Sequence, residues 1–380
     1  MGLPLAASAW ADGPTAAADA VARATAGLAG ADPSLLLLFP DARSSIAEAA
    51  SAAREAVPGA RLAGMSSQGV LSADGSHAGG CSVTAFGPDA DASVGIARNA
   101  SRGPREAGRI AAAMATEGLT LRPGHAVLLL FVDPTSGDEA AAIDGAYSVV
   151  GGQVPLAGGG ANGADPVLIA DDFVGGDAVV AVALCSPAPI AVGVAHGCRP
   201  VSEPAIATRT EGRALRELNG SPAEEVYLNG LGRSAPLDDD EFEAFAVLHP
   251  LGQPELRGQL RLRHVLGRAQ GGGLQCAAPI PPNAAVWFTE QTRETIVASA
   301  VRVVQETRAL LPASPRAGLV FDCAARRRAL GDDVAEEGRE LSAAFGDVSS
   351  LAGLYTRGEV GRVRGAKGDR NHAIVVVAFG

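Results

Sequence analysis

Several side chains near the C-terminus have types that could carry out chemistry. Cys323 ends an apolar segment, and Arg326, Arg327 and Arg328 follow it closely. Guanidinium charge could lower the pKa of this thiol and make it a nucleophile, with His372 as the base. An unpaired cysteine at the end of a strand is more typical of a small buried core residue. We therefore favour a structural Cys323 and keep the catalytic pair as the alternative.

Arg326 and Glu359 form a second candidate site. Arg326 could hold a carboxylate through two parallel hydrogen bonds, which is the geometry that binding an amino acid or an organic acid requires. Glu359 follows a glycine and could accept hydrogen bonds from the amino group of a ligand. A solvated basic turn would also explain the arginines, and Glu359 could instead pair with one of them inside the protein. Both interpretations stay open at this point.

The position of these residues depends on a unit of strand, helix, turn and strand that occurs three times. Apolar runs predict the strands, and Ala-rich stretches with polar residues at helical spacing predict the helices. The first two copies span 30–100 and 122–198, and we expect them to superpose. A short apolar segment, 93–97 in the first copy and 191–195 in the second, follows the last predicted strand of each copy. The predicted elements are 35–39, 44–56, 60–70 and 81–86, then 126–132, 138–150, 154–164 and 178–184, then 317–324, 333–345, 350–360 and 372–379.

The turn of every copy reads Ala-Gly, four residues, Gly. Glycine recurs where the backbone needs a positive φ or where another group must approach closely. A hairpin that merely turns would explain the pattern, and a set of ligand-facing loops is the functional interpretation. On that interpretation the ligand-binding candidates, besides Arg326, Glu359 and Cys323, are Gly64, Ser66, Gly158, Gly159, Asn162, Tyr355 and Asn371.

A stretch of different character, 199–234, separates the second and third copies, and the acidic segment 235–240 is the candidate domain boundary. We predict an α/β (α+β) fold with two lobes of mixed sheets flanked by helices. The predicted parts are a helical lead-in at 1–29, a first domain at 30–234 and a second domain at 241–380.

Charge and composition limit the partners. The net charge of −11 repels phosphate backbones and anionic lipids, so we expect neither nucleic acid nor a membrane surface as a partner. The apolar runs have the length of strands rather than of membrane helices. The five cysteines form no C-x-x-C pair, which fits a reducing cytoplasm.

We also expect no metal and no cofactor. The six histidines show no close metal-binding spacing. Gly158, Gly160 and Gly163 match the dinucleotide fingerprint as a string, but Pro166 and a predicted strand follow them, where that fingerprint must open a helix.

The order of these motifs resembles the FIST family over about residues 30–380. Segments 63–70, 157–163 and 217–227 are similar to its N-terminal domain, and 249–252, Arg263 and 280–286 resemble the following region. Two departures are Asn283, where the family tends to have glycine, and His372-Ala373, where it tends to have a nearby threonine. The positions that resemble the FIST C-terminal pattern are Cys323, Arg326, Gly331, Glu336, Glu337, Gly353, Gly358, Glu359 and Asn371.

This resemblance implies a sensory, signal-transducing protein that binds a small ligand such as an amino acid and catalyses no reaction. The alternatives are a cysteine-dependent enzyme that uses Cys323, and a scaffold whose repeated loops contact a signalling partner such as a kinase or a regulator.

Overall fold

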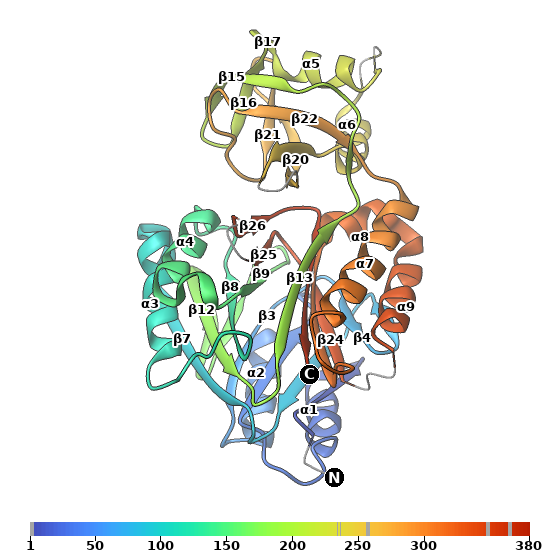
Figure 1. Cartoon of the computed structure of the whole chain (residues 1–380). Coiled ribbons are helices and arrows are strands. Elements are labelled where there is room, and N and C mark those ends of the chain that lie inside the picture. The colour runs from blue at the N-terminus through green and yellow to red at the C-terminus, as the bar shows by residue number, and fades with distance from the viewer. Residues whose placement is uncertain (1–3, 234, 236, 256–258, 347–349, 364–366) are drawn as a thin grey trace.

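The chain forms two lobes of unequal size, of which the larger holds both termini (Figure 1). The computed structural model describes residues 4–233, 235, 237–255, 259–346, 350–363 and 367–380. The predicted mixture of helices with parallel and antiparallel strands is confirmed. No described helix combines the length and the apolar character that crossing a membrane would require.

The larger lobe consists of three units with the same order of elements: an edge strand, a helix, a buried strand, one or two further helices, a second strand, a hairpin and a closing strand. Unit 1 comprises β1 (Ala6–Ala11), α1 (Ala16–Ala26), β2 (Leu35–Pro40), α2 (Ile46–Ala56), β3 (Arg61–Met65), β4 (Val70–Ser72), β5 (Gly75–His77) and β6 (Cys81–Phe86). Unit 2 comprises β7 (Asp91–Arg98), α3 (Pro104–Thr116), β8 (Ala126–Val132), α4 (Glu139–Val150), β9 (Leu156–Gly160), β10 (Leu168–Ala170), β11 (Phe173–Gly175) and β12 (Ala178–Cys185). Unit 3 comprises β13 (Ile190–His196), α7 (Arg293–Arg308), β23 (Ala317–Cys323), α8 (Ala324–Leu330), α9 (Val334–Phe345), β24 (Leu351–Thr356), β25 (Glu359–Arg362), β26 (Asp369–Arg370) and β27 (Ala373–Phe379).

The three units share one strand topology. In each unit the buried strand runs parallel to the next long strand of that unit (β3, β9 or β24), and antiparallel to the closing strand. The three units therefore have the same strand topology, although their bounds differ from those of the predicted copies. Short helical turns also occur at Ala100–Arg102, Gly151–Gln153 and Gly331–Asp333.

The first glycine of each turn lies where two parallel strands pass at short range. Gly64 pairs with Leu38, and Gly158 pairs with Leu130. A Cβ atom at these glycines would lie only 1.8 and 2.1 Å from the carbonyl oxygen of the paired residue. Gly353 repeats the arrangement in unit 3. Strand packing therefore excludes any side chain at this position.

The units exchange hairpins in a cycle. The hairpin β4–β5 of unit 1 pairs with β24 of unit 3, β10–β11 of unit 2 pairs with β3 of unit 1, and β25–β26 of unit 3 pairs with β9 of unit 2. The chain leaves its own sheet at the second glycine of each turn, where φ is +101° at Gly69, +144° at Gly163 and +81° at Gly358. L side chains rarely adopt these values, which accounts for glycine there. Each sheet is therefore completed by a neighbouring unit.

The units begin earlier in the chain than the sequence predicted. Segments 93–97 and 191–195 do not close the preceding copies, because β7 pairs with β12 and β13 pairs with β27. They are the edge strands that open units 2 and 3. In the same way, the expected helical lead-in contains β1, which pairs with β6, before the helix α1.

The smaller lobe is an insertion in unit 3, between β13 and α7, and Figure 1 shows it joined to the larger lobe at its lower end. The lobes therefore do not divide at 235–240: residues 238–240 cap and start α6, and residue 236 lies outside the described residues. The described residues of 293–380, a range that we assigned to the second domain, pack into the larger lobe instead. The elements of the insertion are β14 (Arg199–Pro200), β15 (Ala205–Glu211), β16 (Ala214–Leu218), β17 (Ser221–Pro222), α5 (Ala223–Gly230), α6 (Asp239–Leu248), β18 (Leu251–Pro254), β19 (Leu260–Arg263), β20 (Val265–Ala269), β21 (Gly273–Cys276) and β22 (Ala285–Glu290).

Three equivalent phenylalanines meet in the core of the larger lobe. Phe39, Phe131 and Phe321 each lie near the end of the buried strand of their unit, and none is exposed to solvent. Their ring centroids are 6.0 to 6.3 Å apart, within the range of favourable aromatic pairs. The three units therefore share one core rather than three separate ones.

We predict that Phe131→Ala lowers the free energy of unfolding by about 3–5 kcal/mol, because a buried aromatic side chain is replaced by a cavity. Denaturant unfolding followed by circular dichroism measures the change. Leu310→Ala, at a side chain that is 69% exposed, is the control and should change stability by less than about 0.5 kcal/mol. A cost at Phe131 as small as that of the control would show that the units do not depend on a shared core.

Candidate functional site

A cavity of about 790 Å³ lies between the lobes at the place where the turns of the three units converge. Gln68, Asn162 and Arg357 occupy the same position in their respective turns, four residues after the first glycine, and all three line the cavity. The smaller lobe covers it with residues that include Arg213 and His264. The volume is in the range of ordinary small-molecule sites.

Arg327 supplies a cation to this cavity. It projects from α8, directly after the buried strand β23, and its guanidinium lies 4.8 Å from the centre of the Tyr355 ring. The guanidinium packs over Gly69, where a Cβ atom would lie 2.5 Å from Nη1. Within the described parts of the chain, Nη1 is buried and has no hydrogen-bond partner. Such a donor is expected to find a partner in a ligand or in water.

Glu139 supplies a carboxyl group to the same cavity. It is the first residue of α4, whose N-cap is Asp138, and it packs over Gly358, the turn glycine of unit 3. Its Oε1 is buried and accepts no hydrogen bond from the described residues. Burial, followed by the negative charge of Asp369, raises the pKa of Glu139 to about 8. A cation placed beside this group would favour its charged form.

Cys323, Asn162 and Asn371 are the predicted residues that line the cavity. Cys323 is 4% exposed, and its sulfur accepts a hydrogen bond of 3.3 Å from the backbone N–H of His372. Burial, together with the nearby Glu359, raises the pKa of this thiol well above its ordinary value. Cys323 is therefore kept as a neutral thiol, which is a poor nucleophile.

His372 and Glu359 lie behind the cavity wall. The His372 imidazole shares a hydrogen bond of 2.9 Å with His264 and one of 3.0 Å with Gln291, and burial lowers its pKa well below the ordinary value. Glu359 accepts hydrogen bonds from Thr356 Oγ1 at 3.0 Å and from the backbone N–H of residue 373 at 3.2 Å. Burial raises the pKa of Glu359 well above its usual range. Neither side chain lines the cavity.

Arg326 does not reach the cavity, and it does not pair with Glu359. It is completely buried and forms ion pairs with Asp322, at 2.7 Å, and with Glu337. Ser299 Oγ accepts a further hydrogen bond from Arg326, at 2.9 Å. Burial, followed by Asp322, raises the pKa of Glu337 to about 8. These contacts therefore give Arg326 a structural role in internal ion pairs, with Asp322 and Glu337 rather than with Glu359 as partners.

The remaining predicted ligand residues serve the packing of the turns. Tyr355 is buried and donates its hydroxyl to Ser76, and Ser66 donates to the carbonyl oxygen of Asn162 at 3.1 Å. Gly64, Gly158 and Gly159 are buried in β3 and β9. Glu139, Arg213 and Arg357 were not predicted from the sequence, and Arg327 was predicted only as a charge near Cys323. One signal in the sequence could have identified Arg357: it is the charged residue at the turn position where the other two copies have Gln68 and Asn162.

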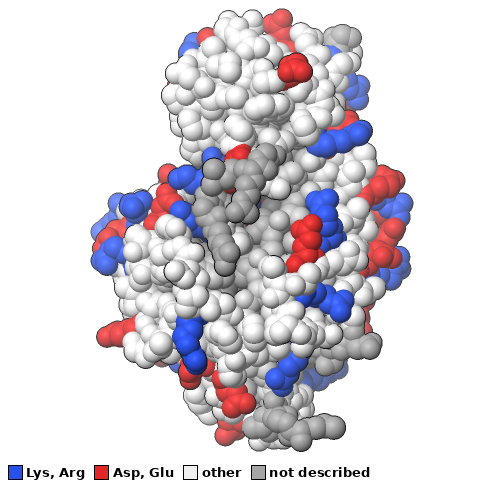
Figure 2. Space-filling view, in the orientation of Figure 1, with Lys and Arg blue, Asp and Glu red and all other residues white. Residues whose placement is uncertain are grey.

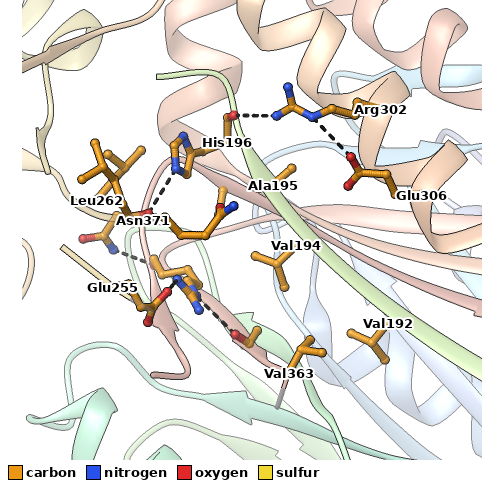
Figure 3. A pocket seen from close by; sticks show the side chains of 15 residues that line it. Val192, Val194, Ala195, His196, Glu255, Leu262, Arg302, Glu306, Val363 and Asn371 are labelled. Atoms are coloured by element: carbon orange, nitrogen blue, oxygen red, sulfur yellow. Dashed lines mark hydrogen bonds and ion pairs between the residues drawn. The ribbon is translucent and has the colours of Figure 1, made fainter. Parts of the chain in front are cut away.

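Asn371 also lines a second cavity, of about 650 Å³ (Figure 3). Val192 and Val194 of β13 form part of its apolar wall. Its charged side chains are paired: Arg370 donates to Glu255 at 2.6 Å, and Arg302 lies 3.9 Å from Glu306. The first cavity, with its unpartnered charged groups, is therefore the better candidate for a polar ligand.

We predict that Arg326→Ala lowers the free energy of unfolding by about 3–5 kcal/mol, because it leaves two buried carboxyl groups without their cation. Arg328→Ala on the same helix is the matched control. Its ion pair with Glu243 is exposed, so the loss should not exceed about 1 kcal/mol. Equal effects of the two substitutions in denaturant titrations would contradict this role of Arg326.

Comparisons with known proteins cover almost the whole chain. The sequence models of the FIST N domain and the FIST C domain match residues 12–221 and 223–362. Such domains are associated with sensory signal transduction and small-ligand binding.

Two proteins of Mycobacterium tuberculosis, from strains CDC 1551 and H37Rv, are each 29% identical over 92% of both chains, and both are described only as uncharacterized. A solved structure, the cyanuric acid hydrolase of A. caulinodans, covers 99% of both chains at 13% identity with a TM-score of 0.32, which is too low to support an argument about activity. The two domain matches, in the predicted order and over nearly the full length, show that the chain belongs to the FIST family.

Proposed function

We propose that this protein is a sensory protein that binds a free amino acid in the cavity between its lobes. The observation that carries the proposal is that Arg327 and Glu139 both line that one cavity, and that each has a buried side-chain atom, Nη1 and Oε1, without a hydrogen-bond partner among the described residues. Leaving either group buried without a partner costs free energy. An amino acid would satisfy both, with its carboxylate on the guanidinium and its ammonium on the carboxyl group.

The position of the cavity supports a sensory role. Its floor belongs to the larger lobe and its cover to the smaller one. Ion pairs such as Arg263 with Asp369, at 2.5 Å, already join the lobes beside it. A ligand that also contacts Arg213 or His264 of the smaller lobe favours the arrangement in which the two lobes enclose it, by its difference in affinity for the enclosing and non-enclosing arrangements. A signalling partner that binds only one arrangement of the lobes would then respond to the presence of the ligand.

The contacts at Cys323 support binding over cysteine-dependent catalysis. The thiol is buried and its raised pKa disfavours the thiolate. His372 contacts the sulfur through its backbone N–H, whereas its imidazole hydrogen-bonds to Gln291 and His264. The imidazole is therefore not placed to remove the proton of the thiol.

We predict that Arg327→Gln weakens amino-acid binding tenfold to a hundredfold, because a hydrogen bond to a charged group contributes about 1.5–3 kcal/mol. Calorimetric titration with the common L-amino acids, one at a time, identifies the ligand and measures the change. Arg302→Gln, in the second cavity, is the control and should bind normally. Loss of binding in Arg302→Gln with normal binding in Arg327→Gln would place the ligand in the second cavity and contradict this proposal.

We predict that amino-acid affinity rises between about pH 6 and pH 8, because Glu139 must lose its proton to bind an ammonium group. Titrations in buffers of different ionisation enthalpy should therefore detect a released proton. Glu139→Gln should bind more weakly and release no proton. Proton release of the same size in Glu139→Gln would assign the effect to another group.

Cys323→Ala should retain amino-acid binding within a few fold, since no ligand group is assigned to the thiol. Loss of binding by a folded Cys323→Ala protein, or covalent labelling of Cys323 by an added metabolite, would favour the cysteine-dependent enzyme.

A further inference from the structure

The charged residues that line the cavity indicate a narrower class of ligand than amino acids in general. After Arg327 and Glu139 are assigned to the two ends of an amino acid, three arginines of the lining remain, of which Arg213 and Arg357 are the two that concern the ligand. Among the residues that the structure describes, neither has an ion-pair partner within 4.0 Å. Arg328, by contrast, pairs with Glu243 at 2.8 Å.

The two arginines approach the cavity from different lobes. Arg213 reaches down from the β15–β16 turn and donates a hydrogen bond from Nη2 to the carbonyl oxygen of Gly137 at 2.6 Å. That contact leaves its other guanidinium N–H groups available and holds the group beside α4. Arg357 is exposed and stands in the unit 3 turn, at the position that Gln68 and Asn162 occupy in the other units. The only charged side chain among these three equivalent positions therefore faces the cavity.

This cluster of arginines contrasts with the rest of the molecule. The chain has 42 acidic and 31 basic residues, and the face in Figure 2 shows both signs interspersed over the larger lobe. In the cavity, Arg213, Arg327 and Arg357 meet a single carboxyl group, Glu139, whose raised pKa keeps most of it neutral near pH 7. A neutral zwitterion would leave this positive charge uncompensated. A confined site of one sign concentrates ligands of the opposite sign.

We infer that the ligand is an acidic amino acid, whose side-chain carboxylate is bound by Arg357 and Arg213 while its ammonium group is bound by Glu139. The inference rests on the proposed function and specifies it. Guanidinium groups suit this task because their planar N–H pairs match the two oxygens of a carboxylate.

The experiment uses matched probes: L-glutamate and L-aspartate, their amides L-glutamine and L-asparagine, and glutarate, which lacks the amino group. Calorimetric titration of the intact protein should show at least tenfold tighter binding of one acidic amino acid than of its amide. Glutarate should bind more weakly than glutamate, because it leaves Glu139 unpartnered.

Arg357→Gln should bring the affinity of the acidic amino acid close to that of the amide and leave the affinity of the amide unchanged. Arg213→Gln should act in the same direction, and Arg302→Gln should change nothing. Because Arg357 is exposed, its substitution is expected to leave the melting temperature unchanged.

Equal affinities for the acid and the amide, both weakened by Arg327→Gln, would overturn the inference and leave the proposed function standing. No binding of any amino acid by the folded protein would contradict the proposed function itself. Glutarate binding as tightly as glutamate, with no effect of Glu139→Gln, would overturn the assignment of the ammonium group.

Discussion

The cyclic exchange of hairpins is the constraint on which the rest of the structure depends. Each unit completes the sheet of a neighbour, so the three sheets are bound into one body around a shared core. The exchange also fixes where the turns lie, because each turn joins a strand of one sheet to a hairpin in another. Gln68, Asn162 and Arg357 therefore come together at one cavity although they are far apart in the sequence.

A single helix separates a structural arginine from a ligand-facing one. Successive residues of α8 point about 100° apart, so Arg326 and Arg327 have different environments. Arg326 turns inward to two carboxyl groups and is completely buried. Arg327 turns toward the cavity, over the ring of Tyr355, and keeps an unpartnered nitrogen. The same residue type thus stabilises the fold at one position and is available to a ligand at the next.

Local patterns in the sequence predicted the repeated part of the fold well. Runs such as Leu35–Phe39 gave strands close to their observed bounds, and the glycine turns lie where they were expected. The edge strands that open each unit were misassigned, because their partners lie later in the chain and no local pattern indicates them. The discontinuous larger lobe was missed for the same reason, since the contacts of residues 317–379 with unit 1 are long-range.

The candidate site was predicted less completely than the fold. The sequence does not show which of three successive arginines points into the core. Arg326 was therefore predicted as the ligand residue instead of Arg327. Glu139 stands one residue after the N-cap Asp138, where an acidic residue is ordinary. Its role depends on the hairpin exchange, which places Gly358 of unit 3 against it.

A crystal structure of the protein grown with L-glutamate would test the central claim most directly. The account predicts density for the amino acid in the cavity between the lobes, with its α-carboxylate within hydrogen-bond distance of Arg327 and its ammonium group beside Glu139. Density for the ligand in the second cavity, beside Arg302, would contradict it. Density for the amino acid in the first cavity would also contradict the claim if Arg327 and Glu139 contacted only water and not the ligand.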